Sequence, residues 1–243
     1  LPQTPAENHT ESAPASAEPA QTTPETNAFH LEYEQTALPE PLSSVTALAM
    51  LEETLLLGGV SETGLALVRL TPEGRSEELP LPGSTEYLYA LCPDGAGGAW
   101  LLCGSLPKGY FDAFGNFRFL SQEPEGKLAL AHYDAAFALQ EIVLLQTLYT
   151  DRFFQLRRLD GGFCMMSASL LVRLDETGAE TARQSLDAKD GWSFAAMQET
   201  DGVLYALTRN FYGIELPELR KFTPDTLSAL ESDVCTSEIT GLG

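Results

Sequence analysis

The chain has 243 residues, 44% of them hydrophobic, and its 35 acidic and 14 basic side chains give a formal net charge of −21. So acidic a surface repels phosphate backbones and anionic membrane surfaces, which disfavours a nucleic-acid-binding function. The best apolar run, residues 137–149, is interrupted by Gln140, Glu141 and Gln146, and it falls short of the ~20 residues that a membrane-spanning helix needs. The sequence therefore predicts one sizeable domain and no transmembrane segment.

Residues 1–28 are predicted to form a disordered linker. They are rich in Pro, Thr, Ala and Glu and contain neither Lys nor Arg, so they have too little apolar surface to offset the entropy of ordering. The segment resembles the spacer that follows the lipid-bearing cysteine of bacterial surface lipoproteins, although it includes no such cysteine and no signal peptide. That resemblance implies an extracytoplasmic protein tethered to the cell surface through this linker. An ordinary interdomain linker is the alternative.

A short phrase recurs along residues 29–243. Its copies begin at Leu67, Leu130, Leu171 and Leu219, and the third is Leu171-Val-Arg-Leu-Asp-Glu-Thr-Gly178, a strand that ends in a turn. The intervals are 63, 41 and 48 residues, and removal of the loop-like residues 107–126 brings the first close to the ~40 to 50 residues of a four-stranded repeat. The repeats are 43–83, 84–146, 147–188 and 189–243.

Each repeat contains four predicted strands. An apolar strand and a turn precede a second apolar strand, the recurring phrase forms the third strand, and a more polar fourth strand follows. Asp-Gly and Gly-Gly pairs in the first turns supply the positive φ angles that tight hairpins need. The second strands are apolar on both faces, which is typical of a strand buried between neighbouring sheets. These second strands are residues 54–59, 99–104, 163–168 and 203–208.

The repeats and the turn Asp94-Gly-Ala-Gly-Gly-Ala-Trp100 resemble β-propeller repeat proteins of the two-component-regulator and NHL type. The resemblance implies an all-β fold, a β-propeller of four-stranded antiparallel blades with about four blades visible. We expect these blades to belong to a larger propeller; a compact four-bladed ring and a β-sandwich or stacked meander are the alternatives. Residues 31–41 match the pattern of a fourth strand, so residues 29–42 are expected to complete the last blade.

Two long aromatic loops form the candidate ligand site. In propellers, the connections between second and third strands share one face with those between blades, and in the second and fourth repeats these connections are long. Aromatic rings beside polar groups on such loops suit stacking on a sugar ring or gripping an apolar peptide. The alternative is a hairpin extension that buries its own aromatics or docks a neighbouring domain. The candidate ligand-binding residues are Tyr110, Phe111, Asp112, Phe114, Trp192, Asn210, Phe211 and Tyr212.

No catalytic, metal-binding or cofactor-binding motif stands out, so we expect no catalytic residues, no metal site and no cofactor. Cys92 and Cys103 flank one hairpin and are expected to lie nearly opposite each other, which leaves a disulfide open. Cys164 and Cys235 are expected to be buried thiols.

His132 is the one histidine inside a repeat, and its position favours a structural role. It occupies the third place of the recurring phrase, where the other copies have Arg69, Arg173 and Lys221. A position that is polar in every copy indicates an outward-facing strand residue rather than a general base.

These features predict a non-catalytic, extracytoplasmic recognition or docking module of a bacterial surface protein. Its expected partner is a carbohydrate or peptide ligand, or another domain of the same protein. The alternative functions are a glycan-active hydrolase or lyase and a purely structural protein-interaction scaffold. Glycoside hydrolysis uses a pair of carboxylates. The sequence argues against a hydrolase or lyase because it offers a single acidic candidate, Glu86, beside an innermost strand.

Overall fold

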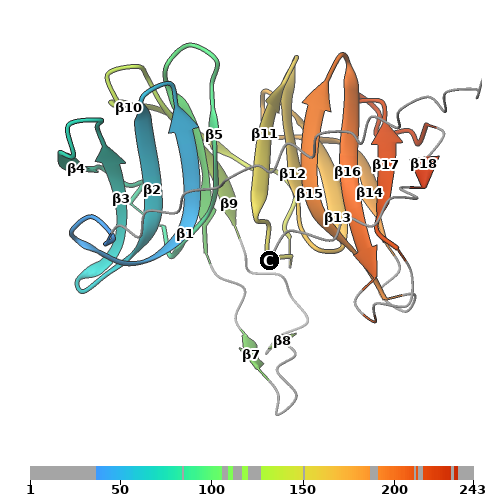
Figure 1. Ribbon diagram of the computed structural model, residues 1–243, viewed down its shortest axis with the longest axis horizontal. Helices are drawn as coiled ribbons and strands as arrows, with labels where there is room; N and C mark the ends of the chain where they lie inside the picture. The colour runs from blue at the N-terminus through green and yellow to red at the C-terminus, as the bar shows by residue number, and fades with distance from the viewer. Residues whose placement is uncertain are drawn as a thin grey trace, which may run out of the picture. The chain divides into compact units, whose positions relative to one another are not determined.

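The computed structural model describes residues 37–83, 85–105, 109–111, 117–119, 127–149, 151–186, 191–210, 212, 216–230 and 233–234. These residues form four antiparallel four-stranded sheets and one short hairpin, and they include no helix (Figure 1). Each sheet is a meander, because its strands follow one another along the chain from the first to the fourth.

The first sheet contains β1 (Leu42–Leu51), β2 (Thr54–Ser61), β3 (Gly64–Leu70) and β4 (Ser76–Leu79). The second contains β5 (Tyr87–Pro93), β6 (Ala99–Gly104), β9 (Leu128–Tyr133) and β10 (Leu139–Leu144), and the hairpin β7 (Gly109–Phe111) and β8 (Phe117–Phe119) is inserted between β6 and β9. The third contains β11 (Gln155–Leu159), β12 (Gly162–Met166), β13 (Leu170–Asp175) and β14 (Glu180–Ser185). The fourth contains β15 (Trp192–Thr200), β16 (Val203–Asn210), β17 (Glu218–Phe222) and β18 (Asp233–Val234).

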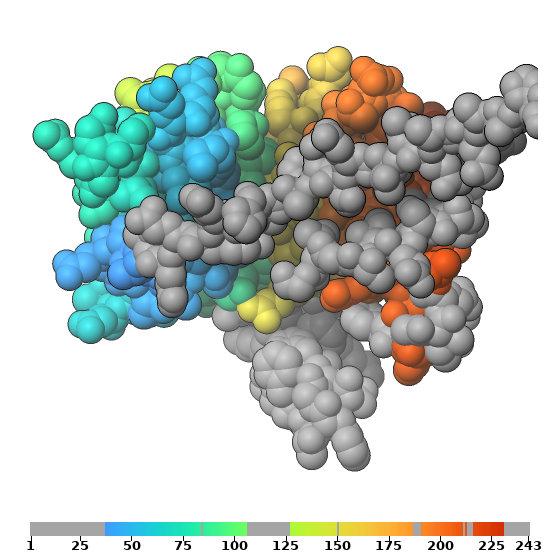
Figure 2. Space-filling model, viewed as in Figure 1, coloured from blue at the N-terminus to red at the C-terminus, as the bar shows by residue number. Residues whose placement is uncertain are grey.

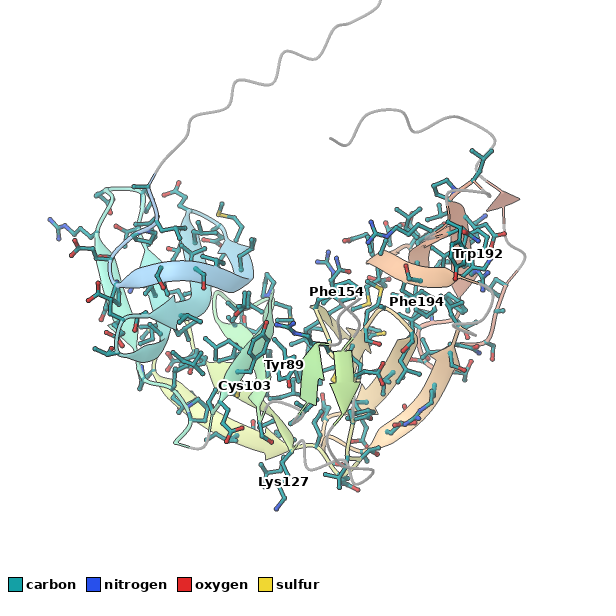
Figure 3. The ribbon with its side chains drawn as sticks, turned by 90° about the horizontal axis from the view of Figure 1, so that it is seen from below. Tyr89, Cys103, Lys127, Phe154, Trp192 and Phe194 are labelled. Atoms are coloured by element: carbon teal, nitrogen blue, oxygen red, sulfur yellow. The ribbon has the colours of Figure 1, made fainter. Side chains whose placement is uncertain are left out.

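The four sheets are the blades of a β-propeller. Their first strands contact one another in succession, β1 with β5, β5 with β11 and β11 with β15. Seen from below in Figure 3, the sheets follow an arc with these strands on its inner side. The predicted propeller of four-stranded antiparallel blades is therefore confirmed, and the alternative of a β-sandwich is wrong.

Two finer predictions about the ring are not tested by these residues. Residues 29–36, most of the expected closing strand, lie outside the described residues, and Ala37–Pro41 precede β1 without joining a sheet. The outermost described strand of the fourth sheet is β18. Closure by residues 29–42 and membership of a larger propeller both stay predictions.

Three apolar layers hold the blades together, one between each pair of consecutive sheets. The second strand of a blade supplies alternate residues to the layers on its two sides. In β6, Leu101 packs toward the first sheet and Leu102 toward the third, and in β12 Met165 and Met166 divide in the same way. This explains why these strands are apolar at every position, since burial of each face contributes about 25 cal/mol per Å² of apolar surface.

An aspartate closes three hairpins of the second and third sheets in the same way. These are the β5–β6, β9–β10 and β13–β14 hairpins. Asp94 Oδ1 accepts hydrogen bonds from the backbone N–H groups of Ala96 (2.7 Å) and Gly98 (2.8 Å). Asp134 and Asp175 accept equivalent bonds from the residues two and four positions later. The carboxylates thus satisfy N–H groups that the strand ladders leave free, which fixes each reversal of the chain.

The prediction that His132 and the matching residues of the other repeats face outward is wrong. Arg173 is only 4% exposed, and its guanidinium donates to the carbonyl oxygens of Phe163 (3.1 Å), Leu174 (2.6 Å) and Asp160. Arg69 lies over the Phe137 ring of the next blade, 4.4 Å from its centroid. These side chains point toward a neighbouring blade because each third strand is covered by sheets on both sides.

The two cysteines of the second sheet do not face each other. Cys92 is opposite Trp100 and Cys103 is opposite Leu88, and the two thiols belong to apolar layers on opposite faces of the sheet. Both are free, as is the buried Cys164. Burial raises the pKa of the Cys92 and Cys164 thiols to about 12, so these groups act as small hydrophobic side chains. Cys235 lies outside the described residues.

Candidate functional site

The candidate ligand-binding residues from the sequence divide into those whose side chains the structure describes and those that it does not describe. Three of them are described. Trp192 and Asn210 belong to the fourth sheet, and Tyr212 lies just after β16. Asp112, Phe114 and Phe211 lie outside the described residues, and of Tyr110 and Phe111 only the backbone of β7 is described. Figure 1 shows β7 and β8 at the end of the sheets at which β16 finishes.

The described candidates meet where β15 begins and β16 ends. Trp192 is the first residue of β15 and is directly opposite Asn210, the last residue of β16. Asn210 Oδ1 accepts a hydrogen bond from the backbone N–H of Tyr212 (2.9 Å), which turns the chain back beside the strand end. The structure therefore brings three of the predicted residues together.

Tyr212 presents its ring to solvent, with 71% of the residue exposed. The ring lies against Gly191, where a Cβ atom would come within 2.5 Å of two ring carbons, and the φ of Gly191 is +72°. Glycine suits this left-handed backbone conformation, and a Cβ atom here would force the Tyr212 ring to shift. An exposed aromatic ring of this kind offers its face to a ligand for stacking.

An ion pair completes the surface beside Trp192. Arg220 lies with its guanidinium carbon 5.7 Å from the centroid of the Trp192 ring, a cation–π contact. Glu218 holds it there, because Glu218 Oε2 accepts from Arg220 Nε (3.1 Å) and lies 3.0 Å from Nη2. Both charged residues border a hollow of about 250 Å³ between β14 and β17. We call Trp192, Asn210, Tyr212, Glu218 and Arg220 the fourth-sheet surface.

The fourth-sheet surface offers the groups that carbohydrates need. The apolar C–H face of a sugar ring stacks on an aromatic ring, and its hydroxyl groups both donate and accept hydrogen bonds. Glu218 offers acceptor oxygens, and Arg220 offers donors in a planar fork. Sequence reasoning missed Glu218 and Arg220, although their spacing of two on a strand places them on one face of the sheet.

A second polar cluster lies on the second sheet and serves packing. His132 stacks on Trp100, with centroids 4.4 Å apart, and its Nε2 is 2.9 Å from Asp94 Oδ2. Burial opposes ionisation of Asp94, but the hydrogen bonds from His132, Ala96 and Gly98 outweigh it and hold the pKa of this carboxyl below its usual range. Among the described residues, the hydrogen bonds of Asp94 go to His132 and to two backbone N–H groups, which fixes the imidazole beside Trp100.

Carboxylates are scarce on the innermost strands. The strands β1, β5, β11 and β15 contain a single acidic residue between them, Glu199 near the end of β15. A carboxylate pair for glycoside hydrolysis would therefore have to include residues from connecting loops. Within the described part of the chain, no three His, Cys, Asp or Glu residues are grouped as metal ligands. The same part of the chain contains no helix with the length and apolarity to span a membrane.

Comparison with known proteins supplies no family. No family model matches the chain, and no curated protein matches it. Solved structures with a similar fold include the GH43 glycoside hydrolase BlXynB from Bacillus licheniformis, with 10% identity over 78% of this chain and 40% of that one (TM-score 0.46). They also include Synechocystis apocarotenoid oxygenase, with 14% identity over 77% of this chain and 50% of that one (TM-score 0.44).

A third similar structure is described as the extracellular domain of a hybrid two-component system from B. thetaiotaomicron. It is 14% identical over 87% of this chain and 24% of that one, with a TM-score of 0.46. The chain thus spans half or less of the length of these three proteins. The β-propeller resemblance is supported at the level of fold, whereas no family model supports the narrower two-component-regulator or NHL repeat type. Similarity at these values carries no argument about substrate or activity.

One prediction from the sequence is corrected by these structures. The chain was interpreted as a non-catalytic module, yet two of the three similar structures are enzymes, a glycoside hydrolase and an oxygenase. The prediction of a non-catalytic module is therefore withdrawn, because the fold also occurs in enzymes. The similarity itself assigns no activity to this chain.

Proposed function

We propose that this protein is a β-propeller that recognises carbohydrate through the fourth-sheet surface. The observation that carries the proposal is the exposed Tyr212 ring against Gly191, next to the strand ends at which Trp192 lies with the Glu218–Arg220 pair. A sugar ring stacks on Tyr212 or Trp192 while its hydroxyl groups meet the polar side chains between them. The protein acts outside the cytoplasm, where residues 1–28 serve as a tether.

Action on the bound carbohydrate is the second candidate. The Glu218 carboxylate lies at the hollow beside Trp192, so a glycan held at this surface is in reach of one acidic group. One carboxylate is half of the pair that hydrolysis requires, and the other half would come from a connecting loop. Release of reducing sugar from the glycans that bind distinguishes this candidate from recognition alone.

A glycan array tests the proposal. The full chain is expected to bind at least one oligosaccharide class, and Tyr212→Ala and Trp192→Ala are expected to weaken that binding about tenfold, because each removes one stacking surface. Tyr110→Ala and Phe211→Ala test the two aromatic loops in the same assay. Phe154→Ala is the matched control, since Phe154 is an exposed aromatic on a different sheet.

Two results contradict the proposal. One is the failure of the wild-type chain to bind any glycan on the array. The other is binding by Tyr212→Ala and Trp192→Ala with the affinity of the wild type, which would move the ligand site away from the fourth-sheet surface.

A further inference from the structure

The concave side of the propeller carries exposed apolar side chains. A hollow of about 510 Å³ is lined by β1, β5 and β11 together with Phe154. Leu48 is 63% exposed there, Met50 is 59% exposed and Phe154 is 42% exposed. Figure 3 places Phe154 on the inner side of the sheets. Large apolar side chains that remain exposed around one hollow indicate a binding surface, because burying them in a ligand is favourable.

A single cation, Arg157 of β11, stands at the edge of this hollow. It lines both the apolar hollow and a neighbouring polar hollow of about 820 Å³. The polar side chains on either side of it are engaged, since Gln155 Oε1 accepts from the backbone N–H of Met197 (2.7 Å) and Arg158 donates to Glu176 (2.9 Å). The side chain of Arg157 makes neither a hydrogen bond nor an ion pair with any other described residue.

The local charge of the hollow is opposite to that of the whole chain. None of the described residues that line it is acidic, although the chain contains 35 acidic residues. Five acidic residues line the neighbouring polar hollow, yet none pairs with Arg157 in the described part of the chain. A free guanidinium that borders an apolar wall matches a carboxylate attached to an apolar body, because guanidinium binds carboxylate through two parallel hydrogen bonds.

We propose that this hollow binds a small organic acid with an apolar chain. The carboxylate of the ligand pairs with Arg157, and its chain lies over Leu48, Met50 and Phe154. The volume of about 510 Å³ is within the ~300 to 1,000 Å³ typical of small-molecule sites. The hollow and the fourth-sheet surface have no residue in common, so each site can fail without the other.

Calorimetric titration of the full chain tests the proposal, with sodium decanoate as the probe. Decanoate is expected to bind with one-to-one stoichiometry, whereas acetate lacks the apolar chain and decylammonium carries the wrong charge, so both are expected to bind far more weakly. Arg157→Gln is expected to weaken decanoate binding about tenfold or more, since it removes the charged hydrogen-bond donor. Arg183→Gln is the matched control, because Arg183 is an exposed arginine paired with Glu180 on β14.

A second variant protects the test against misfolding. Met50 is exposed, so Met50→Glu is compatible with the fold, and it places a negative charge where the decanoate chain would lie. It is expected to abolish decanoate binding while the circular dichroism spectrum and glycan binding stay unchanged. The proposal is overturned by a wild-type chain that does not bind decanoate, by acetate or decylammonium binding as tightly as decanoate, or by unchanged affinity in either variant.

Discussion

At the scale of single residues, buried charge is the feature that most distinguishes this propeller. Arg173 lies inside the layer between the third and fourth sheets, and its guanidinium ties three backbone carbonyl groups of the third sheet together. Its nearest carboxylate, that of Asp225 in the next blade, is 3.9 Å away. The side chain therefore works as a hydrogen-bonded strut between strands rather than as half of a surface ion pair.

Replacement of this strut is expected to be costly. Arg173→Met keeps most of the apolar volume but leaves the three carbonyl oxygens without their donor, so the free energy of unfolding should fall by about 2 to 4 kcal/mol. Arg183→Gln breaks only an exposed pair and should change it by less than about 1 kcal/mol. Urea denaturation measures both, and equal effects of the two substitutions would contradict the role given to Arg173.

Asp94 should make the stability of the second blade sensitive to acid. Its pKa in the folded protein is lowered from 3.8, so the carboxylate stabilises the fold above that value, and this contribution is lost as the pH falls through the lower folded-state pKa. Asp94→Asn should therefore destabilise the protein by about 1 kcal/mol at neutral pH. The difference from wild type should shrink below about pH 4. Urea midpoints recorded across the pH range test this, and a difference that is independent of pH would refute it.

At the scale of elements, the start of the second strand is a point of close approach in the second and third sheets, at Gly98 and Gly162. At Gly162 a Cβ atom would lie 2.0 Å from the carbonyl oxygen of Leu174 on β13, and φ is +147°. Gly162→Ala should therefore push β12 from β13 and lower the free energy of unfolding by about 2 to 4 kcal/mol. Gly83→Ala, where a Cβ meets nothing within 4 Å, should change it by less than about 0.5 kcal/mol. Thermal unfolding of both variants tests this prediction. Equal unfolding temperatures for Gly162→Ala and Gly83→Ala would contradict it.

Strand order could be predicted from the sequence, whereas strand facing could not. Alternation, turn residues and the recurring phrase are local signals, and they locate β3, β9, β13 and β17 correctly. The direction of a side chain such as Arg173 depends on the neighbouring blade, because both faces of these strands are covered. The partner of Cys92 depends on the length of the β5–β6 turn, and that of Cys103 also on a bulge between Leu88 and Ala90; composition reveals neither.

The candidate site was predictable to the same limited extent. Trp192, Asn210 and Tyr212 were found because long aromatic loops interrupt the repeat. Glu218 and Arg220 were missed, since they belong to the regular part of β17 and gain their meaning from the Trp192 ring beside them. Arg157 belongs to the regular part of β11 and no local motif marks it, whereas the structure shows that it lines two hollows.

At the scale of the whole molecule, the net negative charge of the chain destabilises the folded state. The chain has 35 acidic and only 14 basic residues, so repulsion among carboxylates exceeds the attraction of the few surface ion pairs at neutral pH. Salt screens these interactions over about 10 Å at 0.1 M. Raising the sodium chloride concentration should therefore increase the urea midpoint of unfolding. A midpoint that falls with salt would show that the ion pairs dominate.

Carbohydrate recognition by the fourth-sheet surface is the central claim, and affinity electrophoresis tests it most directly. Native gels that contain a series of soluble neutral and acidic polysaccharides are run with the wild-type chain, Tyr212→Ala and the control Phe154→Ala. We expect at least one polysaccharide to retard the wild type and Phe154→Ala while Tyr212→Ala migrates as it does in a gel without polysaccharide. Unretarded migration of the wild type in every gel, or equal retardation of all three proteins, would contradict the claim.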